Sequence, residues 1–317
     1  MKPQKIVILG TGGTIAGRAA SASDNVGYMA AQVGIAQLVA AIPSITDVGP
    51  VDTEQVAQID SKDMSFAIWA QLATRVVHFL AQPEVQGIVI THGTDTLEET
   101  AYFLQAVCKP AKPVVLTCAM RPASALAPDG PQNVLDAVMV ARHPGAQGVV
   151  AVCAGAIHSA QDVQKVHTYQ LDAFSSGDAG PLGYVEAGTL RLVRNWPSAQ
   201  QGWEYCAMKN TALLNGGANW PRVEIVMNHA GATGAVVEAL LAQGDLRGLV
   251  VAATGNGTLH HDLETALLKA QAAGVRVVRA TRCAHGRVLP TSGDMIADSA
   301  GLSPVKARVD LMLRLLG

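Results

Sequence analysis

The sequence predicts an α/β protein with a large N-terminal parallel-sheet domain and a smaller C-terminal α/β domain. Short β-branched runs recur along the 317 residues, and stretches of helix length separate them. With 49% hydrophobic residues, the chain can bury one large core or two ordinary ones. Because parallel strands need helical crossovers, we expect the main sheet to be buried on both faces.

The elements of the N-terminal domain follow from this alternation. Four β-branched runs are the predicted strands: 6–9, 87–90, 114–118 and 148–153. Amphipathic stretches between them are the predicted helices: 64–80, 97–107 and 134–141. A Pro-Asp-Gly-Pro turn at Pro128–Pro131 precedes the last of these helices.

The pattern breaks down after about residue 188, where Trp196, Pro197 and Trp203 precede a Gly216-Gly217 pair. We therefore divide the chain into an N-terminal catalytic domain, 1–190, a linker, 191–219, and a C-terminal α/β domain, 220–317. The C-terminal domain has its own predicted strands and a final helix: 223–227, 249–253, 275–279 and 304–316.

Charge and composition favour a small, near-neutral partner. The formal net charge is −2 and no long basic run occurs, which argues against nucleic acid or anionic lipid as a partner. Only four apolar residues, 6–9, stand before the first glycines, too few for a signal peptide, and no run of about 18 apolar residues occurs. We expect a cytoplasmic protein that does not span a membrane. Five cysteines without a C-x-x-C spacing favour buried, reduced thiols.

Two glycine–threonine turns follow predicted strands. Residues 10–14 read Gly-Thr-Gly-Gly-Thr, and residues 91–95 read Thr-His-Gly-Thr-Asp. The carboxyl ends of parallel strands form the binding crevice of an open sheet, where glycines expose backbone N–H groups and threonines supply hydroxyls. Such a turn could hold an oxyanion or a phosphate. However, Ile15 breaks the dinucleotide fingerprint and no lysine lies near the turn, so nucleotide binding is a weak runner-up.

The second turn also has a purely structural interpretation. Thr96 and Glu99 have the spacing of a capping box, and early acidic residues favour the helix dipole. Against this, two separate strand ends each present a Gly-Thr pair, and Asp95 beside Thr94 offers a carboxylate within hydrogen-bonding range of a hydroxyl. An amide-cleaving site needs such groups.

These segments resemble a known family. Residues 11–17, Thr-Gly-Gly-Thr-Ile-Ala-Gly, and 91–100, Thr-His-Gly-Thr-Asp-Thr-Leu-Glu-Glu-Thr, resemble the two signature segments of bacterial-type L-asparaginases and glutaminase-asparaginases. Further similar segments extend over nearly the whole chain: 119–122, 172–174, 180–183, 255–257 and 302–308. The resemblance implies hydrolysis of L-asparagine to L-aspartate and ammonia by a homo-oligomer, a dimer of dimers, with no cofactor and no metal.

The same resemblance implies five catalytic residues. Thr14 would attack the side-chain amide and form an acyl-threonine ester, and Tyr28, on the loop after the first strand, would hydrogen-bond to Thr14 and close over the substrate. Lys165 would lie between Asp95 and Thr94, so that Thr94 acts as a base or positions the attacking water. Spacing alone does not choose between Thr14 and Thr94 as the nucleophile; the resemblance chooses Thr14.

Substrate binding is also assigned by the resemblance. Asp60, Ser61 and Lys62 match the segment that holds the α-carboxylate of the substrate. Gly93, Thr94, Asp95 and Ala119 would complete the pocket, with Asp95 pairing with the α-amino group. Lys62 departs from the family's usual glutamine. Lysine only donates hydrogen bonds and carries a charge, so we expect a change in affinity, pH response or substrate choice.

Three further positions concern the C-terminal domain. Asn256 matches an asparagine that reaches the site from a neighbouring subunit. Between residues 282 and 302 the chain is short and lacks a recognisable match to the family's cross-subunit glutamate, for which Asp294 is the candidate substitute. Losing that contact would relax the discrimination between asparagine and glutamine. The run His260-His261-Asp262 predicts a polar helix start rather than a metal site, because no third ligand has standard spacing.

Four alternatives accompany the main prediction. The nearest is a broader glutaminase-asparaginase. A tRNA-dependent amidotransferase subunit would need a partner-docking extension that the sequence does not show. A non-catalytic amino-acid-binding protein would not need two hydroxyl nucleophile candidates. A nicotinamide oxidoreductase is disfavoured by the failed fingerprint.

Overall fold

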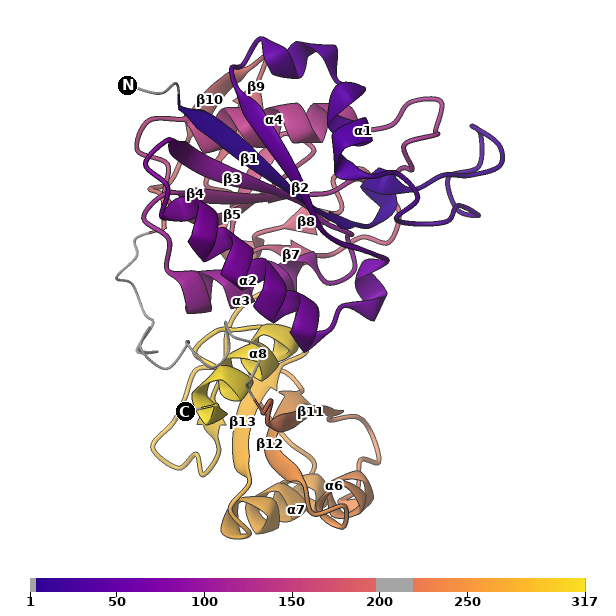
Figure 1. Cartoon of the computed structure of the whole chain (residues 1–317). Coiled ribbons are helices and arrows are strands. Elements are labelled where there is room, and N and C mark those ends of the chain that lie inside the picture. The colour runs from indigo at the N-terminus through magenta and orange to yellow at the C-terminus, as the bar shows by residue number, and fades with distance from the viewer. Residues whose placement is uncertain (1–3, 198–218, 317) are drawn as a thin grey trace. The chain divides into compact units, whose positions relative to one another are not determined.

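A computed structural model describes residues 4–197 and 219–316 of the chain (Figure 1). The chain divides into two compact units, Met1–Gly216 and Gly217–Gly317, each with its own sheet. The predicted α/β fold class is confirmed. Most of the predicted linker, residues 198–218, lies outside the described residues, and strand β10 (Thr189–Leu192) extends into its first positions. The boundaries of the linker therefore stay a prediction.

The first unit is built on an eight-stranded sheet with the order β10-β9-β6-β5-β4-β3-β1-β2. The first five strands, β1 to β5, run parallel to one another, whereas β6, β9 and β10 are joined to β5 and to one another by antiparallel pairs at one edge. The strand bounds are β1 (Lys5–Gly12), β2 (Val51–Ile59), β3 (Val85–Thr91), β4 (Pro113–Thr117), β5 (Gly148–Cys153), β6 (Ala156–Ser159) and β9 (Gly183–Glu186).

Helices cover both faces of this sheet, as the sequence predicts. Helices α1 (Ile35–Ala40) and α4 (Gly130–Arg142) pack with Ile8 and Val89 in one core cluster on one face. Helices α2 (Phe66–Leu80) and α3 (Leu97–Cys108) lie together on the other face (Figure 1). The central strands are therefore buried, and the buried hydroxyls of Thr14 and Thr94 lie just beyond the carboxyl ends of two of them.

The second unit contains a four-stranded parallel sheet in the order β11-β12-β13-β14. The three predicted strands and the final helix of this domain are present. The bounds are β11 (Arg222–Met227), β12 (Leu246–Ala253), β13 (Arg276–Thr281), β14 (Ala297–Asp298), α6 (Ala235–Leu241), α7 (His261–Ala272) and α8 (Pro304–Leu315).

Two sequence expectations concern the chain as a whole. Among the described residues, no helix combines the length and the apolar character that crossing a membrane requires. The expectation of buried, reduced thiols holds for Cys118 and Cys153, which are free and buried with their Sγ atoms 3.3 Å apart. It is wrong for Cys283, which is exposed, and Cys108 is only partly buried. Cys206 lies outside the described residues.

Candidate active site at the ends of the parallel strands

The two glycine–threonine turns meet at the carboxyl ends of β1 and β3. Gly12 and Gly13 have φ values of 104° and 81°, a conformation that side chains rarely adopt. A Cβ atom on Gly13 would collide with the backbone of Gly93, and one on Gly93 would collide with Ser61. Because Gly13 and Gly93 have no side chains, the backbones of the two turns pack directly against each other, and Ser61 packs directly against Gly93.

Thr14 begins a short 3₁₀ helix, Thr14–Ala16, directly after this turn, and only 7% of it is exposed. Its Oγ1 hydrogen-bonds to the phenolic oxygen of Tyr28 at 2.6 Å. The loop that carries Tyr28 is closed at its base by two backbone hydrogen bonds between Arg18 and Met29, of 2.9 and 2.8 Å. The structure thus brings Thr14 and Tyr28 together, as the sequence predicts, in a pair that can pass a proton.

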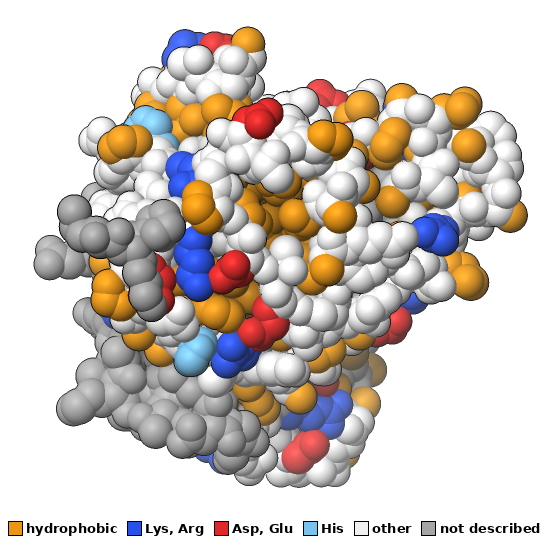
Figure 2. Space-filling model, turned by 45° about the horizontal axis from the view of Figure 1, so that its top comes forward, with side chains coloured by type: hydrophobic (Ala, Val, Ile, Leu, Met, Phe, Trp, Pro, Cys, Tyr) orange, Lys and Arg blue, Asp and Glu red, His pale blue; other side chains and the backbone are white. Residues whose placement is uncertain are grey.

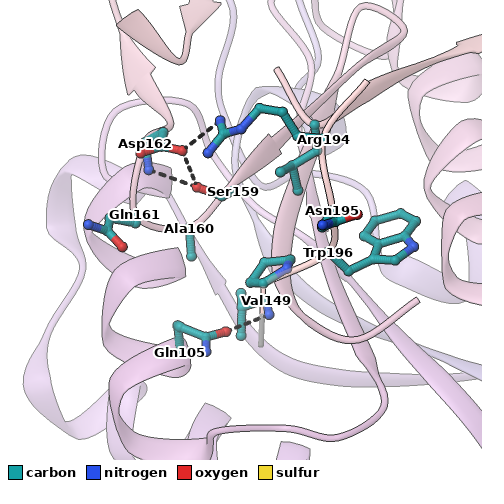
Figure 3. A pocket seen from close by; sticks show the side chains of 11 residues that line it. Gln105, Val149, Ser159, Ala160, Gln161, Asp162, Arg194, Asn195 and Trp196 are labelled. Atoms are coloured by element: carbon teal, nitrogen blue, oxygen red, sulfur yellow. Dashed lines mark hydrogen bonds and ion pairs between the residues drawn. The ribbon is translucent and has the colours of Figure 1, made fainter. Parts of the chain in front are cut away.

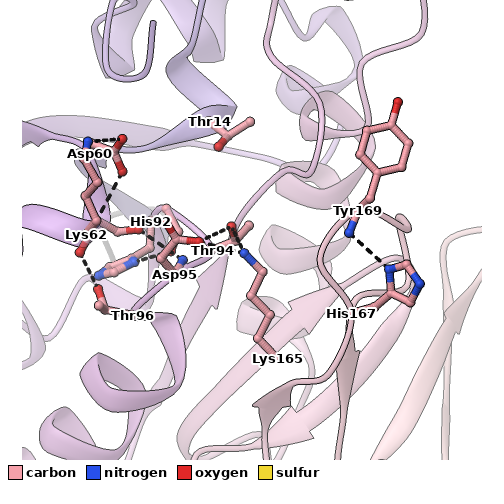
Figure 4. Close-up of polar contacts among 12 residues, drawn as sticks. Thr14, Asp60, Lys62, His92, Thr94, Asp95, Thr96, Lys165, His167 and Tyr169 are labelled. Atoms are coloured by element: carbon pink, nitrogen blue, oxygen red, sulfur yellow. Dashed lines mark hydrogen bonds and ion pairs between the residues drawn. The ribbon is translucent and has the colours of Figure 1, made fainter. Parts of the chain in front are cut away.

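Thr94, Asp95 and Lys165 form a second hydrogen-bonded group (Figure 4). The Nζ of Lys165 donates to Thr94 Oγ1 at 2.8 Å and to Asp95 Oδ1 at 2.7 Å. Thr94 Oγ1 lies 3.5 Å from Asp95 Oδ1, so the lysine makes the main link between the two side chains. Lys165 reaches this position from β7 (Gln164–Lys165), which pairs with β8 (Phe174–Ser175).

Ser61 is buried beneath the second group and fixes it. Its Oγ accepts a 3.1 Å hydrogen bond from the backbone N–H of Asp95, which leaves the hydroxyl proton of Ser61 to donate elsewhere. Its carbonyl oxygen accepts a 2.8 Å bond from Thr96 Oγ1. The structural alternative of a capping box is not borne out on the Thr96 side: Thr96 occupies the N-cap position of α3 without a side-chain capping bond, and its hydroxyl donates to the Ser61 carbonyl instead.

Lys62 lies beside this serine with its side chain 62% exposed. Its ammonium group is 2.7 Å from Asp60 Oδ2 and 3.5 Å from Asp63 Oδ2. The hydrogen bond that Lys62 donates to Asp60 raises the pKa of Lys62, and the charges of both aspartates act in the same direction. Lys62 stands where the family usually has a neutral glutamine, and its positive charge is thus balanced by two neighbouring carboxylates.

His92 is a buried residue of the second turn to which the sequence analysis gave no role. Its Nδ1 lies 2.7 Å from the carbonyl oxygen of Gly93, so the neutral ring donates from this nitrogen. Burial lowers the pKa of His92 to about 4. Its Nε2 has no hydrogen-bond partner among the described residues. The imidazole therefore supports the turn as a neutral group.

Ala119, two residues beyond β4, is also fully buried.

The candidate residues of the second unit have partners within that unit. The side-chain amide of Asn256 is exposed and forms two bonds with the backbone of Leu289, of 2.7 and 3.2 Å. Both carboxylate oxygens of Asp294 are bonded by Arg279, and the backbone N–H of Thr291 adds a 2.8 Å bond. These bonds, with that from Arg279 the strongest, lower the pKa of Asp294 to about 2. Asp294 is therefore a structural ion-pair partner of Arg279, which its sequence position did not reveal.

His260, His261 and Asp262 present ligand atoms that all lie within 4.8 Å of one another. The predicted polar helix start is confirmed, because α7 begins here and His260 Nδ1 accepts a 3.3 Å bond from the backbone N–H of Asp262. This capping bond uses one of the nitrogen atoms that a metal would need.

Comparisons with known proteins cover nearly the whole chain. Residues 5–198 match the family described as "Asparaginase, N-terminal", and residues 222–316 match the "Glutaminase/Asparaginase C-terminal domain". The chain is 37% identical to L-asparaginase 2 of Bacillus subtilis, over 98% of this chain and 82% of that protein. It is 36% identical to the glutaminase-asparaginase of Pseudomonas fluorescens, over 99% and 87%.

A solved structure shows the same similarity in three dimensions. The crystal structure of a probable cytoplasmic L-asparaginase from Campylobacter jejuni has a TM-score of 0.91 and 37% sequence identity. The match covers 98% of this chain and 95% of that one. The fold and the order of the two units are thus common to both proteins.

Proposed function

Because the chain belongs to the asparaginase family, we propose that it hydrolyses L-asparagine to L-aspartate and ammonia through an acyl-threonine intermediate on Thr14. The observation that carries this proposal is the meeting of two proton-transfer groups at one sheet edge. Thr14 is bonded to Tyr28 at 2.6 Å, and Lys165 links Thr94 to Asp95. No cofactor or metal has a step in this reaction.

The first half of the proposed reaction uses Thr14 and Tyr28. Thr14 Oγ1 attacks the amide carbon while its proton passes to the phenolic oxygen of Tyr28, and the phenolic proton passes to the leaving nitrogen. The carbon–nitrogen bond then breaks and ammonia leaves, so that the acyl group remains as an ester on Thr14. The short distance between Thr14 and Tyr28 suits this direct relay.

The second half uses Thr94, Asp95 and Lys165. Thr94 Oγ1, held by Lys165, positions a water molecule that attacks the ester carbon. The proton that the water loses passes through the phenol of Tyr28 to Thr14 Oγ1 as the ester bond breaks, which restores the Thr14 hydroxyl and forms aspartate. Asp95 pairs with the α-ammonium group of the substrate, and Ser61 donates its free hydroxyl proton to the α-carboxylate. Asp60, Lys62, Gly93 and Ala119 complete the proposed binding pocket.

A broader glutaminase-asparaginase is the second candidate. It is favoured by the similarity to a protein of that name. It is also favoured by Asp294, the candidate for the acid that binds the substrate's amino group: this carboxylate is paired with Arg279 within the same unit. One additional methylene changes binding by only about 1–3 kcal/mol, so pocket size alone separates the two amides weakly. An amino-acid-binding protein without activity would release no ammonia from either amide. A tRNA-dependent amidotransferase subunit generates ammonia for a partner, so ammonia release does not exclude it; that alternative is disfavoured because the sequence shows no partner-docking extension.

Ammonia release at saturating L-asparagine, L-glutamine and D-asparagine tests the proposal. We expect release from L-asparagine, and a comparison of kcat/KM for the two L-amides then distinguishes an asparaginase from a broader enzyme. The absence of release from all three amides would overturn the proposed function.

We further propose that the protein is a homotetramer, a dimer of dimers, in which Asn256 reaches the active site of a neighbouring subunit. We also propose that the protein is cytoplasmic. The location is supported by the similarity to a probable cytoplasmic L-asparaginase. A small-molecule substrate, rather than nucleic acid, agrees with the surface in Figure 2, where Lys and Arg side chains are interspersed with Asp and Glu. Sedimentation equilibrium measures the oligomeric state directly.

A further inference from the structure

Lys165 is held on its carboxyl side by a very short strand pair. It pairs with Phe174 in the ladder of β7 and β8, and the backbone N–H of Val166 donates to the carbonyl oxygen of Ala173 at 2.8 Å. Two strands of two residues each are too short to fix a side chain by themselves. The position of Lys165 therefore also depends on the segment that precedes it.

That segment is a tight turn after β6, at residues 159–163. The backbone N–H groups of Asp162 and Val163 both donate to the carbonyl oxygen of Ser159, at 3.2 and 2.9 Å. Asp162 stands only three positions before Lys165, so at most about 10 Å of chain separates their Cα atoms. A displacement of the turn is therefore transmitted to Lys165.

The side chain of Asp162 holds this turn (Figure 3). Its Oδ2 accepts hydrogen bonds from Ser159 Oγ at 2.8 Å and from Arg194 Nη1 at 3.0 Å, and its backbone N–H donates to Ser159 Oγ at 3.0 Å. Because this side chain is only 19% exposed, water and salt screen its charge less than they screen a surface carboxylate. One carboxylate thus closes the turn and ties it to Arg194.

Arg194 is itself anchored to other segments of the first unit. Its Nη1 also donates to the carbonyl oxygen of Gly180 at 2.7 Å, and its backbone N–H donates to that of Leu182 at 3.0 Å. Leu182 is buried, and its own N–H donates to Ile157 of β6 at 2.7 Å. The guanidinium group is therefore a fixed donor for Asp162 rather than a freely moving surface charge.

A pocket of about 670 Å³ adjoins the turn, and Ser159, Asp162 and Arg194 belong to its lining (Figure 3). Because this space lies against the turn, side-chain packing restrains the turn from fewer sides than it restrains a segment enclosed in the core. The polar contacts of Asp162 therefore carry more of the restraint here than they would in a packed interior.

We propose that Asp162 and Arg194 are positioning residues of the active site, whose ion pair fixes the turn so that Lys165 Nζ reaches both Thr94 and Asp95. The bonds of Nζ to these two side chains measure 2.8 and 2.7 Å, and a displacement of about 1 Å would break them. The positioning role rests on the proposed function, in which Lys165 organises the second catalytic group. Asp162 and Arg194 are given no contact with the substrate.

A double-mutant cycle tests whether Asp162 acts through Lys165. We expect Asp162→Asn to lower kcat for asparagine at least about tenfold, and Arg194→Leu, which breaks the same pair from the other side, to do the same. In the Lys165→Met background, the addition of Asp162→Asn should lower kcat no further, because the side chain that the pair positions is already gone. An equal loss in both backgrounds would overturn the proposal.

The reactivity of Lys165 provides a second measurement, which needs no turnover. Its Nζ donates two hydrogen bonds and its side chain is only 20% exposed, so limited acetylation of the full chain with acetic anhydride should modify it slowly. Mass spectrometry of the acetylated sites should show at least about threefold faster modification of Lys165 in Asp162→Asn and Arg194→Leu. The exposed Lys269 should react at an unchanged rate in both variants.

Glu186→Gln is the matched control. It removes the acid of another arginine pair in the first unit, that with Arg191 at 2.6 Å, on the strand next to β6. We expect wild-type kcat and wild-type acetylation of Lys165, and thermal unfolding verifies that each variant is folded. Unchanged acetylation of Lys165 in both pair variants would overturn the proposal. If the wild type releases no ammonia, the proposed reaction fails, whereas the acetylation rates still decide whether the pair positions Lys165.

Discussion

The two threonine turns of the first unit resemble each other in sequence but differ in the chemistry around their hydroxyls. Thr14 is bonded to a neutral phenol on a surface loop, whereas Thr94 is bonded to the ammonium group of Lys165, which also holds Asp95. A hydroxyl with a neutral relay partner is suited to attack an uncharged amide carbon. A hydroxyl fixed by charges is suited to orient water and substrate. The difference teaches that equivalent strand ends can divide one reaction between them.

Removing the Thr14 hydroxyl tests the first side of this comparison and should have the largest effect. In Thr14→Ala we expect kcat for asparagine to fall by about 10⁴-fold or more, because the variant lacks the hydroxyl that we propose as the nucleophile. Thr189→Ala, on an exposed position of β10, is the matched control and should keep wild-type turnover. Wild-type-like turnover in Thr14→Ala would transfer the role of nucleophile to Thr94.

Replacing Lys165 tests the second side. Lys165→Met removes both bonds that organise Thr94 and Asp95, so we expect kcat to fall by about 10²–10⁴-fold. If this group serves mainly the hydrolysis of the ester, ammonia should appear in a rapid first turnover before the slow steady state. Rapid-quench measurement of ammonia detects this burst. Lys269→Met, at an exposed position of α7, is the control, and an unchanged kcat for Lys165→Met would break the proposed division of roles.

The third prediction concerns the neutral histidine that supports only the second turn. Burial lowers the pKa of His92 from 6.5 to about 4, so the unfolded chain binds this proton more readily than the folded chain. The stability from a neutral His92 is complete above pH 6.5 and is lost as the pH falls toward 4, by about 3 kcal/mol in the free energy of unfolding. Urea unfolding at pH 8, 6 and 4 should show a smaller loss in His92→Gln.

His261→Gln is the control for this pH series, because the side chain of His261 is 84% exposed. Its loss of stability on acidification should equal that of the wild type. An identical loss in His92→Gln would mean that other groups account for the acid sensitivity of the protein.

The smallest effect is expected at Lys62, beside the serine that holds the second turn. Lys62→Gln should change KM for asparagine by up to about tenfold, with a smaller change in kcat, because the lysine charge is already shared with Asp60 and Asp63. Lys5→Gln removes a lysine paired with Asp52 at the same 2.7 Å, far from the turns, and is the control. An unchanged KM in Lys62→Gln would show that Lys62 does not face the substrate.

The elements that the sequence predicted correctly are those with strong local patterns. The runs at 6–9 and 148–153 are β-branched and apolar because β1 and β5 are buried on both faces. The sequence analysis missed β2, Val51–Ile59, because it is an edge strand in which a run of four polar residues, 52–55, breaks the alternation and only Val56 is buried. It also missed β6, β9 and β10, which are four residues each and carry little periodicity.

The capping box shows how a local pattern is overridden. Thr96 and Glu99 have the correct spacing, but the Thr96 side chain is oriented toward the buried carbonyl of Ser61, 35 positions earlier, to which its hydroxyl donates, and it makes no capping bond. Spacing within one segment carries no information about a carbonyl that only folding brings near. The same limit applies to Asp294, whose position in a short loop did not reveal its pairing with Arg279.

The sequence by itself determined the α/β class, the glycine turns at the ends of two strands and the threonines that follow them, because periodicity and glycine conformations act over a few residues. The Thr14–Tyr28 pair spans only 14 positions. Without the resemblance, only the tertiary structure could decide that Lys165, 71 positions from Thr94, completes the second group, and that the buried Nε2 of Gln105 has no partner within residues 4–197 and 219–316. Those arrangements depend on which strands pair and in what register, which is settled by burial across the whole sheet.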